Sequence, residues 1–406
     1  MQIMEISIND FENFSKNHIL YNFHQSINYA LLKAEEGYEY DFIGGFENNE
    51  LLAASLIIYK RLGNSYYGYA PRGFLMDYSN PLYVESFTNA IIDYYKEKNF
   101  AFIKINPEIA IATLNKNTKE FVYNENYKII DILINNNYKK LKNNMYFESL
   151  LPRINVIINT DNLSFYNFSK NTKNKIRKAI RKGLTIENGT QNKFDIFYEF
   201  IKDKTDKEKI HYNYYYNVFK KNDKVDLLLV KINYEQFLIN SQKAYDMELI
   251  RNSELNEAII QNSTSNVINE KMNSDKTLLA YKNDIAEASK HLLDKDTYIA
   301  GALIIKDYDR ITVQISGFNK DYNRFAPNYY LYYAILSTYK NTHKYIDLNG
   351  ITADMSKDSP YHGLNNFKLG FNPNVYEFIG EFDLIIDEDS YNHLLHSGLL
   401  AKEFNK

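Results

Sequence analysis

The densest group of chemically active side chains in the sequence is a run of cations between residues 170 and 182. Its apolar positions, Ile176, Ala179 and Ile180, recur at helical spacing, so the run predicts one helix with a strongly basic face. Such a face can bind the phosphates of tRNA or the headgroups of anionic lipids. It can equally be a solvated surface that acidic neighbours balance, and the sequence leaves these alternatives open. The cations are Lys170, Lys173, Lys175, Arg177, Lys178, Arg181 and Lys182.

Composition excludes several other kinds of chemistry. The 406-residue chain contains no Cys, which excludes disulfides, a thiol nucleophile and thiolate metal sites. None of the eight His residues falls in an HxxxH or HExxH spacing, so we expect no metal site. The net charge is −3, so any contact with nucleic acid must depend on a local cationic patch.

The N-terminus has no basic segment followed by an apolar stretch, so it does not have the pattern of a signal peptide. No apolar run approaches the roughly 20 residues that a membrane span needs. We therefore expect a cytoplasmic protein that can still visit a membrane surface.

Two stretches of the chain share one order of elements. Both read as mixed α/β, with apolar runs that predict strands and amphipathic runs that predict helices. In the first stretch the expected strands are 41–46, 51–59, 65–70 and 101–105, and the expected helices are 24–36 and 82–97. In the second the expected strands are 154–158, 225–232, 298–305 and 311–316, and the expected helices are 171–182, ended by Gly183, and 193–202. The repetition indicates two copies of one fold.

A polar segment at 234–296 interrupts the second stretch and contains neither Pro nor Gly. Its second half carries apolar residues in steps of three and four, which is typical of a coiled-coil seam. The seam consists of Leu278, Tyr281, Ile285, Ala288 and Leu292. A turn near 262–265 would make the segment an antiparallel hairpin, although two amphipathic helices packed on the domain would show the same pattern.

Motifs spread over essentially the whole chain resemble, in their order, those of the FemABX family of peptidoglycan bridge aminoacyltransferases. The first is the helix Ile27-Asn-Tyr-Ala-Leu-Leu-Lys33 followed by Tyr69-Ala-Pro-Arg72-Gly73. The second is the basic helix itself. The third is a closing run that comprises Asp347-Leu-Asn-Gly350-Ile351, Gly363-Leu-Asn-Asn-Phe367-Lys368 and Glu377-Phe-Ile-Gly380-Glu-Phe382.

The resemblance implies an α/β (α+β) fold of two GNAT-like domains with an inserted antiparallel coiled-coil arm. On this interpretation the first domain covers 1–150 and is completed by the C-terminal segment 377–406. The second domain covers 151–376, and the arm covers 234–296.

The resemblance also implies roles for individual residues. Lys368, beside Phe367, would lie at the reacting centre and stabilise charge that develops on a carbonyl oxygen. Lys33 would bind the diphosphate of the acceptor, with Arg72 as a neighbour. The other expected substrate-binding residues are Tyr69, His211, Tyr215, Tyr216 and Gly350.

Each of these roles has a plainer alternative. Lys368 could be a helix-surface Lys that follows a buried Phe, and Arg72 could pair with a carboxylate at a strand end. Lys33 could be a solvated Lys at the end of a helix whose apolar residues Ile27, Ala30 and Leu31 point inward.

Three positions depart from the family pattern. Phe74 follows Gly73 where the family usually has Pro. His211 occupies the place of an Arg, and the charge of a His fades above pH ~6.5. Asn106 stands before Pro107 where the family commonly has Asp.

The implied reaction moves an amino acid from aminoacyl-tRNA to the side-chain amine of the third residue of a peptidoglycan stem peptide. It needs no cofactor, because aminoacyl-tRNA is a co-substrate. The implied partners are a lipid-linked or UDP-linked muropeptide, the inner face of the plasma membrane and other bridge-forming transferases.

Two other classes of protein remain open. One is a GNAT-type N-acyltransferase that uses acyl-CoA, whose pyrophosphate would rest on the turn Gln314-Ile-Ser-Gly317-Phe-Asn319. That turn ends in Asn, and we expect a loop to follow it instead of a helix. The other is a non-catalytic coiled-coil protein that binds RNA through the basic helix.

Overall fold

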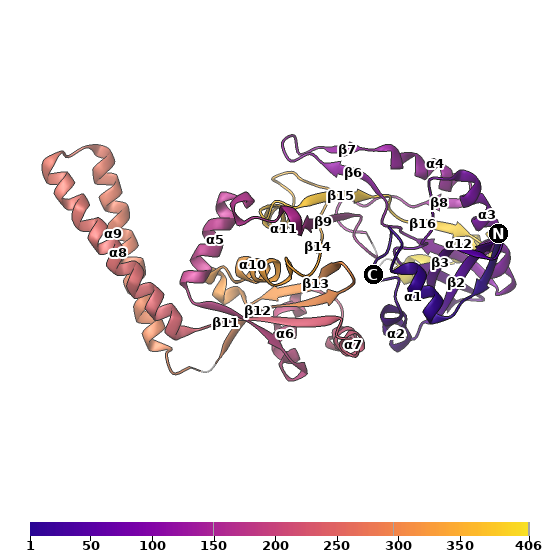
Figure 1. Cartoon of the computed structure of the whole chain (residues 1–406), viewed down its shortest axis with the longest axis horizontal. Coiled ribbons are helices and arrows are strands. Elements are labelled where there is room, and N and C mark those ends of the chain that lie inside the picture. Colours follow the sequence, from indigo (N-terminus) through magenta and orange to yellow (C-terminus); the bar gives the residue numbers. More distant parts are fainter. Residues whose placement is uncertain (149, 295, 405–406) are drawn as a thin grey trace.

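The computed structural model describes residues 1–148, 150–294 and 296–404, which form two sheet-centred halves and a projecting helical arm (Figure 1). Within the described residues the first sheet has seven strands. In spatial order they are β1 (Gln2–Glu5), β2 (Glu39–Glu47), β3 (Glu50–Leu62), β4 (Ser65–Ala70), β5 (Phe100–Ile105), β16 (Phe382–Ile385) and β8 (Tyr138–Lys140).

The second sheet has nine strands in the described part of the chain. In spatial order they are β10 (Leu184–Gly189), β11 (Val225–Ile232), β12 (Thr297–Lys306), β13 (Arg310–Phe318), β14 (Tyr345–Gly350), β9 (Ile154–Asn159), β15 (Asn374–Phe378), β6 (Ala110–Leu114) and β7 (Phe121–Tyr123). The hairpin of β6 and β7 therefore belongs to the second sheet, although it precedes residue 150. Strand β16, close to the C-terminus, returns to the first sheet.

Helices cover both sheets. Those of the first half are α1 (Ile8–Ser15), α2 (Ile27–Glu35), α3 (Pro81–Glu97), α4 (Ile129–Ile134), α12 (Glu388–His396) and α13 (Leu399–Phe404). Those of the second half are α5 (Lys170–Arg181), α6 (Phe194–Ile201), α7 (Lys209–Lys220), α10 (Pro327–Tyr339) and α11 (His362–Leu369). The arm consists of α8 (Tyr234–Gln261) and α9 (Ser265–Lys290).

The two halves repeat one topology, which confirms the predicted doubling of a mixed α/β fold. In each half an antiparallel meander (β2–β3–β4 or β11–β12–β13) is followed by a helix and a parallel strand (β5 or β14). The parallel pairs differ in one respect. β4 and β5 stay paired up to Ala70 and Ile105, whereas β13 and β14 pair only through Thr312 and Asp347. The carboxyl ends of β13 and β14 therefore diverge.

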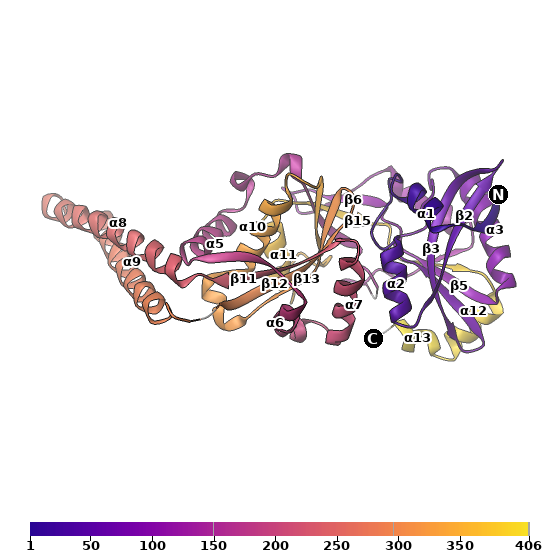
Figure 2. The ribbon, with the colours of Figure 1, turned by 60° about the horizontal axis from the view of Figure 1, so that its bottom comes forward.

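Apolar packing joins the halves. One buried cluster combines residues of α2, β2 and β3 with residues of α6, α7 and β11. At its edge the amide of Asn28 donates to the carbonyl of Val218 at 3.3 Å and accepts from Asn222 at 3.0 Å. In both views α2 and α7 lie side by side (Figure 2). Helix α2 thus presents its residues to the space between the halves.

Local signals explain how α2 and α5 begin and end. Ser26 caps α2 by accepting from the amide of Tyr29, and Ser169 caps α5 by accepting from Thr172. α5 ends before Gly183, which has a φ of +71° and lies against the carbonyl of Asn233, so a side chain would not fit there. The predicted end of this helix is confirmed.

The arm turns at 262–264, within the predicted turn, and its helices contact each other along their length. Its seam is more polar than the sequence indicates. Ala288 is buried, but Leu292 is exposed, and the buried residue of α8 beyond Ser241 is the polar Asn252. Asn252 donates to Ser274 at 3.0 Å and to Asp275 at 2.9 Å. The hairpin is present, and coiled-coil packing stays a prediction.

Candidate functional site

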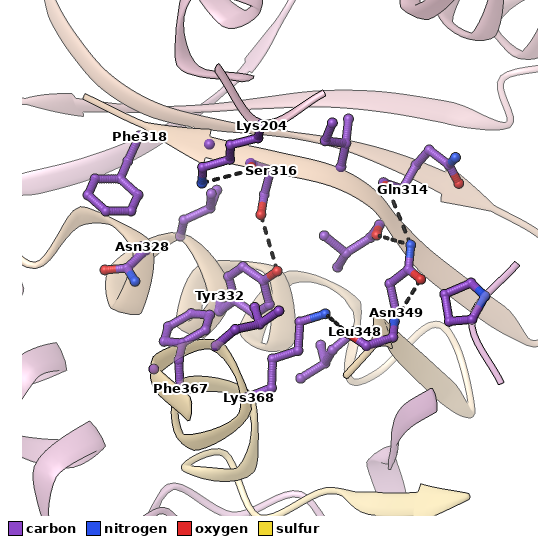
Figure 3. A pocket seen from close by; sticks show the side chains of 18 of the residues that line it. Lys204, Gln314, Ser316, Phe318, Asn328, Tyr332, Leu348, Asn349, Phe367 and Lys368 are labelled. Carbon is purple, nitrogen blue, oxygen red and sulfur yellow. Dashed lines mark hydrogen bonds between the residues drawn. The ribbon is translucent and has the colours of Figure 1, made fainter. Parts of the chain in front are cut away.

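The divergence of β13 and β14 opens a cavity of about 530 Å³ in the second half (Figure 3). Its walls are the end of β13 from Val313 to Phe318, the end of β14 from Leu348 to Gly350, and residues of α10 and α11. Asn349 has a φ of +67°, and its side-chain amide donates to the carbonyls of Val313 and Gln314 at 3.4 and 3.3 Å. This side chain bridges the strands just where their own pairing has ended.

Lys368 projects from α11 into this cavity and is 6% exposed (Figure 3). Its Nζ donates to the carbonyl of Gly350 at 2.6 Å, the one hydrogen bond that its ammonium makes within the described residues. Burial lowers the pKa of Lys368 to about 8, and the nearby Asp347 carboxylate opposes that shift. The group is therefore a cation near neutral pH with hydrogens still available to a ligand.

The depressed pKa of Lys368 predicts how stability depends on pH. The unfolded side chain titrates near 10.5 and the folded one near 8, so between these values the unfolded chain binds more protons. The free energy of unfolding should therefore rise with pH in this window. Relative to Lys368→Met, the wild type should gain about 3 kcal/mol, at 1.36 kcal/mol per unit of pKa. Denaturant unfolding of both proteins from pH 7.5 to 10.5 measures this gain, and parallel profiles would refute it.

Aromatic rings and a glycine shape the rest of the cavity. The ring of Phe367 packs edge-on against Tyr332 and Tyr329, with centroids 4.8 and 5.0 Å apart. Tyr332 shares a hydrogen bond of 3.1 Å with Ser316 across the cavity. A Cβ at Gly350 would collide with Pro152, so only glycine lets these segments approach. The structure thus brings together three expected site residues from the closing run: Phe367, Lys368 and Gly350.

A second cavity, of about 310 Å³, lies between the halves and holds four of the expected substrate-binding residues: Lys33, Tyr69, His211 and Tyr215. Its charged groups are linked through Glu36, which lies 2.7 Å from both Lys33 Nζ and His211 Nδ1. Burial opposes ionisation of this carboxyl, but His211 and Lys33 lower its pKa to about 2. Burial likewise disfavours the Lys33 ammonium, while Tyr215 and Glu36 raise its pKa. Glu36 and Lys33 are therefore both ionised at neutral pH.

Gln314 lines both cavities, so they meet at this residue. Leu150 and Leu151 line the second cavity, and the next residue, Pro152, lines the first. Two ligands, one in each cavity, would therefore approach each other beside Gln314.

Arg72 and Tyr216 lie outside both cavities. Arg72 is buried, with its guanidinium donating to the carbonyl of Pro152 at 2.8 Å and lying 5.2 Å from the centre of the Phe378 ring. Tyr216 packs against Phe194 in the cluster that joins the halves. The contacts of both side chains are with other groups of the protein.

Asn106 stands where the family commonly has Asp, and its side chain fixes the backbone that follows β4 at Arg72. Its side-chain oxygen accepts from the backbone amide of Arg72 at 2.9 Å and from the hydroxyl of Tyr69 at 3.2 Å. Arg72 has a φ of +56°, and the side chain of Asn106 helps to hold that turn.

Two cations that line the cavities, Lys204 and Lys207, have no role expected from the sequence, and Gln314 has one only as part of a CoA-binding turn. Lys204 reaches the first cavity, where its Nζ donates to the carbonyl of Ser316 at 3.4 Å and lies 5.1 Å from the centre of the Phe318 ring (Figure 3). Lys207 reaches the second. The signal for both is the cluster of four Lys residues between 202 and 209, just before His211.

Two absences hold for the residues that the structure describes. They contain no group of three or more His, Asp or Glu side chains arranged to hold a metal ion. None of their helices combines the length and apolar character of a membrane span.

Comparisons with known proteins agree with this architecture. The sequence profile of the FemAB family matches residues 6–395. An aminoacyltransferase FemA of Staphylococcus epidermidis is 26% identical, with 97% of this chain and 98% of the relative covered. A lipid II:glycine glycyltransferase of the same species is 23% identical over 97% of this chain and 94% of the relative. The crystal structure of FemX superposes with a TM-score of 0.72 at 19% identity, covering 97% of this chain and all of the other.

Proposed function

Because the chain belongs to the FemAB family, we propose that it is an aminoacyltransferase that builds the peptide bridge of peptidoglycan. It moves an amino acid from aminoacyl-tRNA to the side-chain amine of the third residue of a precursor stem peptide. The observation that carries the proposal is the pair of adjoining cavities, one containing the buried Lys368 and one containing Lys33 and His211. A transfer between two large substrates requires such an arrangement.

The donor occupies the first cavity. Its ester carbonyl lies beside Lys368, whose ammonium donates to the oxygen as the amine attacks and negative charge develops there. The amine nitrogen bonds to the carbonyl carbon, and the ester bond to the 3′ oxygen of the tRNA breaks. The attacking amine loses one proton, and the departing 3′ oxygen gains one. The ester is already activated, so positioning and charge stabilisation are the main requirements, and positioning alone supplies roughly 7–11 kcal/mol at best.

The acceptor occupies the second cavity. Its diphosphate lies beside Lys33, with Lys207 and His211 as further polar partners on the same walls. The printed name of the glycyltransferase relatives, with lipid II as the substrate, supports a lipid-linked acceptor for this chain. A lipid-linked acceptor would bring the protein to the inner face of the plasma membrane, and we further propose other bridge-forming transferases as partners there.

The geometry of the Gln314–Asn319 turn favours an aminoacyl donor over acyl-CoA. Gln314 to Gly317 belong to strand β13, and a 3-10 turn (Lys320–Phe325) follows before α10 begins. A pyrophosphate cradle needs backbone amides at the start of a helix. Moreover, a Cβ on Gly317 would collide with the backbone carbonyl of Phe200, so that side of the turn is already filled.

Donor dependence tests the proposal. Purified protein is incubated with a soluble UDP-linked muropeptide and with either a mixed pool of charged tRNA or acetyl-CoA. We expect transfer from charged tRNA and its loss after ribonuclease treatment. Transfer from acetyl-CoA without tRNA would contradict the proposal, as would a protein that binds tRNA and never consumes the aminoacyl ester.

A further inference from the structure

Helix α5 carries positive charge that the protein does not balance. Its twelve residues include six cations and no acid. Within the described residues one ion pair connects these six to a carboxylate, between Arg181 Nη2 and Asp284 Oδ2 at 3.9 Å. Arg177, Lys170 and Lys175 are exposed. The alternative interpretation is that acidic neighbours balance the cations of this helix. The contacts of α5 do not support it, because one ion pair does not neutralise six cations.

Exposed aliphatic side chains lie directly beside these cations. On α8, Ile239, Met247 and Ile250 are 55%, 64% and 63% exposed, and on α5 Ile180 is 44% exposed. Positions 239, 243, 247 and 250 follow one face of α8 in steps of three and four. Lys243 and Met247 of that face adjoin Arg177 and Ile180 across a groove of about 320 Å³. Ile239 and Ile250 line the neighbouring groove, which shares Lys243 and Met247 with the first. We name Arg177, Ile180, Ile239, Lys243, Met247 and Ile250 the α5–α8 surface.

Specific contacts hold the α5–α8 surface together. The side-chain amide of Asn240 donates to the carbonyl of Ile180 at 3.2 Å, which joins the two helices at the centre of the surface. Behind it, Lys182 forms a buried ion pair with Asp284 of α9 at 2.6 Å, between the rings of Phe237 and Phe325. The root of the arm is therefore fixed to the end of α5. In Figures 1 and 2, α5 lies between the arm and α10.

We propose that the α5–α8 surface docks onto an anionic lipid bilayer. A bilayer uses both of its components, because cations bind lipid phosphates while neighbouring aliphatic side chains enter the acyl boundary. RNA would use only the cations and would leave four aliphatic side chains in water. The arm as a whole also does not suit a phosphate backbone, since α8 has five acidic and two basic residues and α9 has four of each.

The α5–α8 surface lies close to the cavity that contains Lys368. The functional meaning of this closeness rests on the proposed function. The amide of Ser169, at the start of α5, donates to the carbonyl of Gly370 at 2.8 Å, two residues beyond Lys368. Helix α5 is about 18 Å long at 1.5 Å per residue. The docked bilayer would thus lie within one short helix of the reacting cavity, close enough to present a lipid-linked precursor.

Vesicle flotation of the full chain, without substrates, tests the inference. We expect binding to phosphatidylcholine vesicles that contain phosphatidylglycerol and little binding to pure phosphatidylcholine. Arg177→Gln and Lys243→Gln should each weaken binding about fivefold at low salt. Met247→Asp should weaken it about tenfold or more, because a charge replaces an inserted apolar group. The matched controls, Ile260→Asp and Lys282→Gln, alter exposed residues of the arm outside the surface and should leave binding unchanged.

Each other outcome overturns the inference. Equal binding to both kinds of vesicle, or variants that bind as the wild type does, would contradict it. If the variants lose affinity for tRNA but not for vesicles, the surface belongs to the nucleic acid. A wild type that binds vesicles but transfers no amino acid to the soluble precursor would contradict the proposed function and leave the docking surface standing.

Discussion

Replacing Lys368 by Met is expected to lower the rate of amino-acid transfer by about a hundredfold or more. The ammonium is buried at the divergence of β13 and β14, and one of its hydrogens is committed to Gly350. Removal of the remaining donors leaves the carbonyl oxygen without a cation at a buried position, where such a donor is most effective. Because the interaction strengthens only as charge develops, kcat should fall and KM for both substrates should change little.

Lys204→Met is the matched control for this prediction. Lys204 lines the same cavity from the opposite wall, next to Phe318. Its loss removes a cation of the cavity but not the donor beside Gly350, so kcat should fall far less. Single-turnover rates with charged tRNA measure both variants. A Lys368→Met protein that transfers at the wild-type rate, or a Lys204→Met protein that is equally impaired, would show that the chemistry is assigned to the wrong residue.

Replacing Lys33 by Ala is expected to raise KM for the muropeptide precursor about tenfold, since a charge-assisted contact to phosphate is lost. The contact acts alike in the ground state and the transition state, so kcat should stay close to that of the wild type. Raising the salt concentration should weaken the wild type more than the variant. Affinity for aminoacyl-tRNA should barely change. A loss of tRNA affinity with unchanged precursor affinity would reverse the assignment of the two cavities.

Glu36→Gln is expected to change KM for the precursor in the opposite direction. It therefore distinguishes an effect of charge on phosphate binding from an effect on the shape of the cavity. Glu36 lies 2.7 Å from Lys33 and from His211, and its negative charge opposes an incoming diphosphate. Its neutral isostere should therefore lower KM for the precursor. If Lys33→Ala and Glu36→Gln both raise KM, the cluster maintains the shape of the cavity and does not bind phosphate through its charge.

The fold could be predicted from the sequence because its signals are local. Runs such as 225–232 and 298–305 are apolar enough to specify buried strands, and Ser169 and Gly183 mark the ends of a helix. Which side chains of a helix are buried depends on the surfaces against which the helix packs. Leu31 was expected to point inward, but it is exposed and Leu32 is buried in its place, because α2 packs between two halves and not on one sheet.

The site could be predicted only in part, since its cavities depend on contacts between distant segments. Phe367 and Lys368 are adjacent in sequence, but Gly350 joins them only because β14 ends beside α11. Periodicity gives no sign that Glu36 would link Lys33 to His211, or that Arg72 would be buried against Pro152. Gln314, at the junction of the cavities, belongs to a strand end whose significance depends on where β13 and β14 separate.

The arm shows the same limit in another form. Its helices and turn follow from a long polar segment without Pro or Gly. Asn252, a polar residue of α8, occupies a buried position between the two helices because Ser274 and Asp275 satisfy its amide. A pattern of apolar residues alone cannot find a seam that hydrogen bonds hold together.

The most direct test of the proposed function is the mass of the product. Wild-type protein is incubated with charged tRNA and lipid-linked precursor, and the stem peptide is released and fragmented in a mass spectrometer. We expect a gain of one amino-acid residue, or a short run of residues, on the side-chain amine of the third residue, and none with Lys368→Met. An unchanged precursor, or an acyl group on any other amine, would contradict the proposed function.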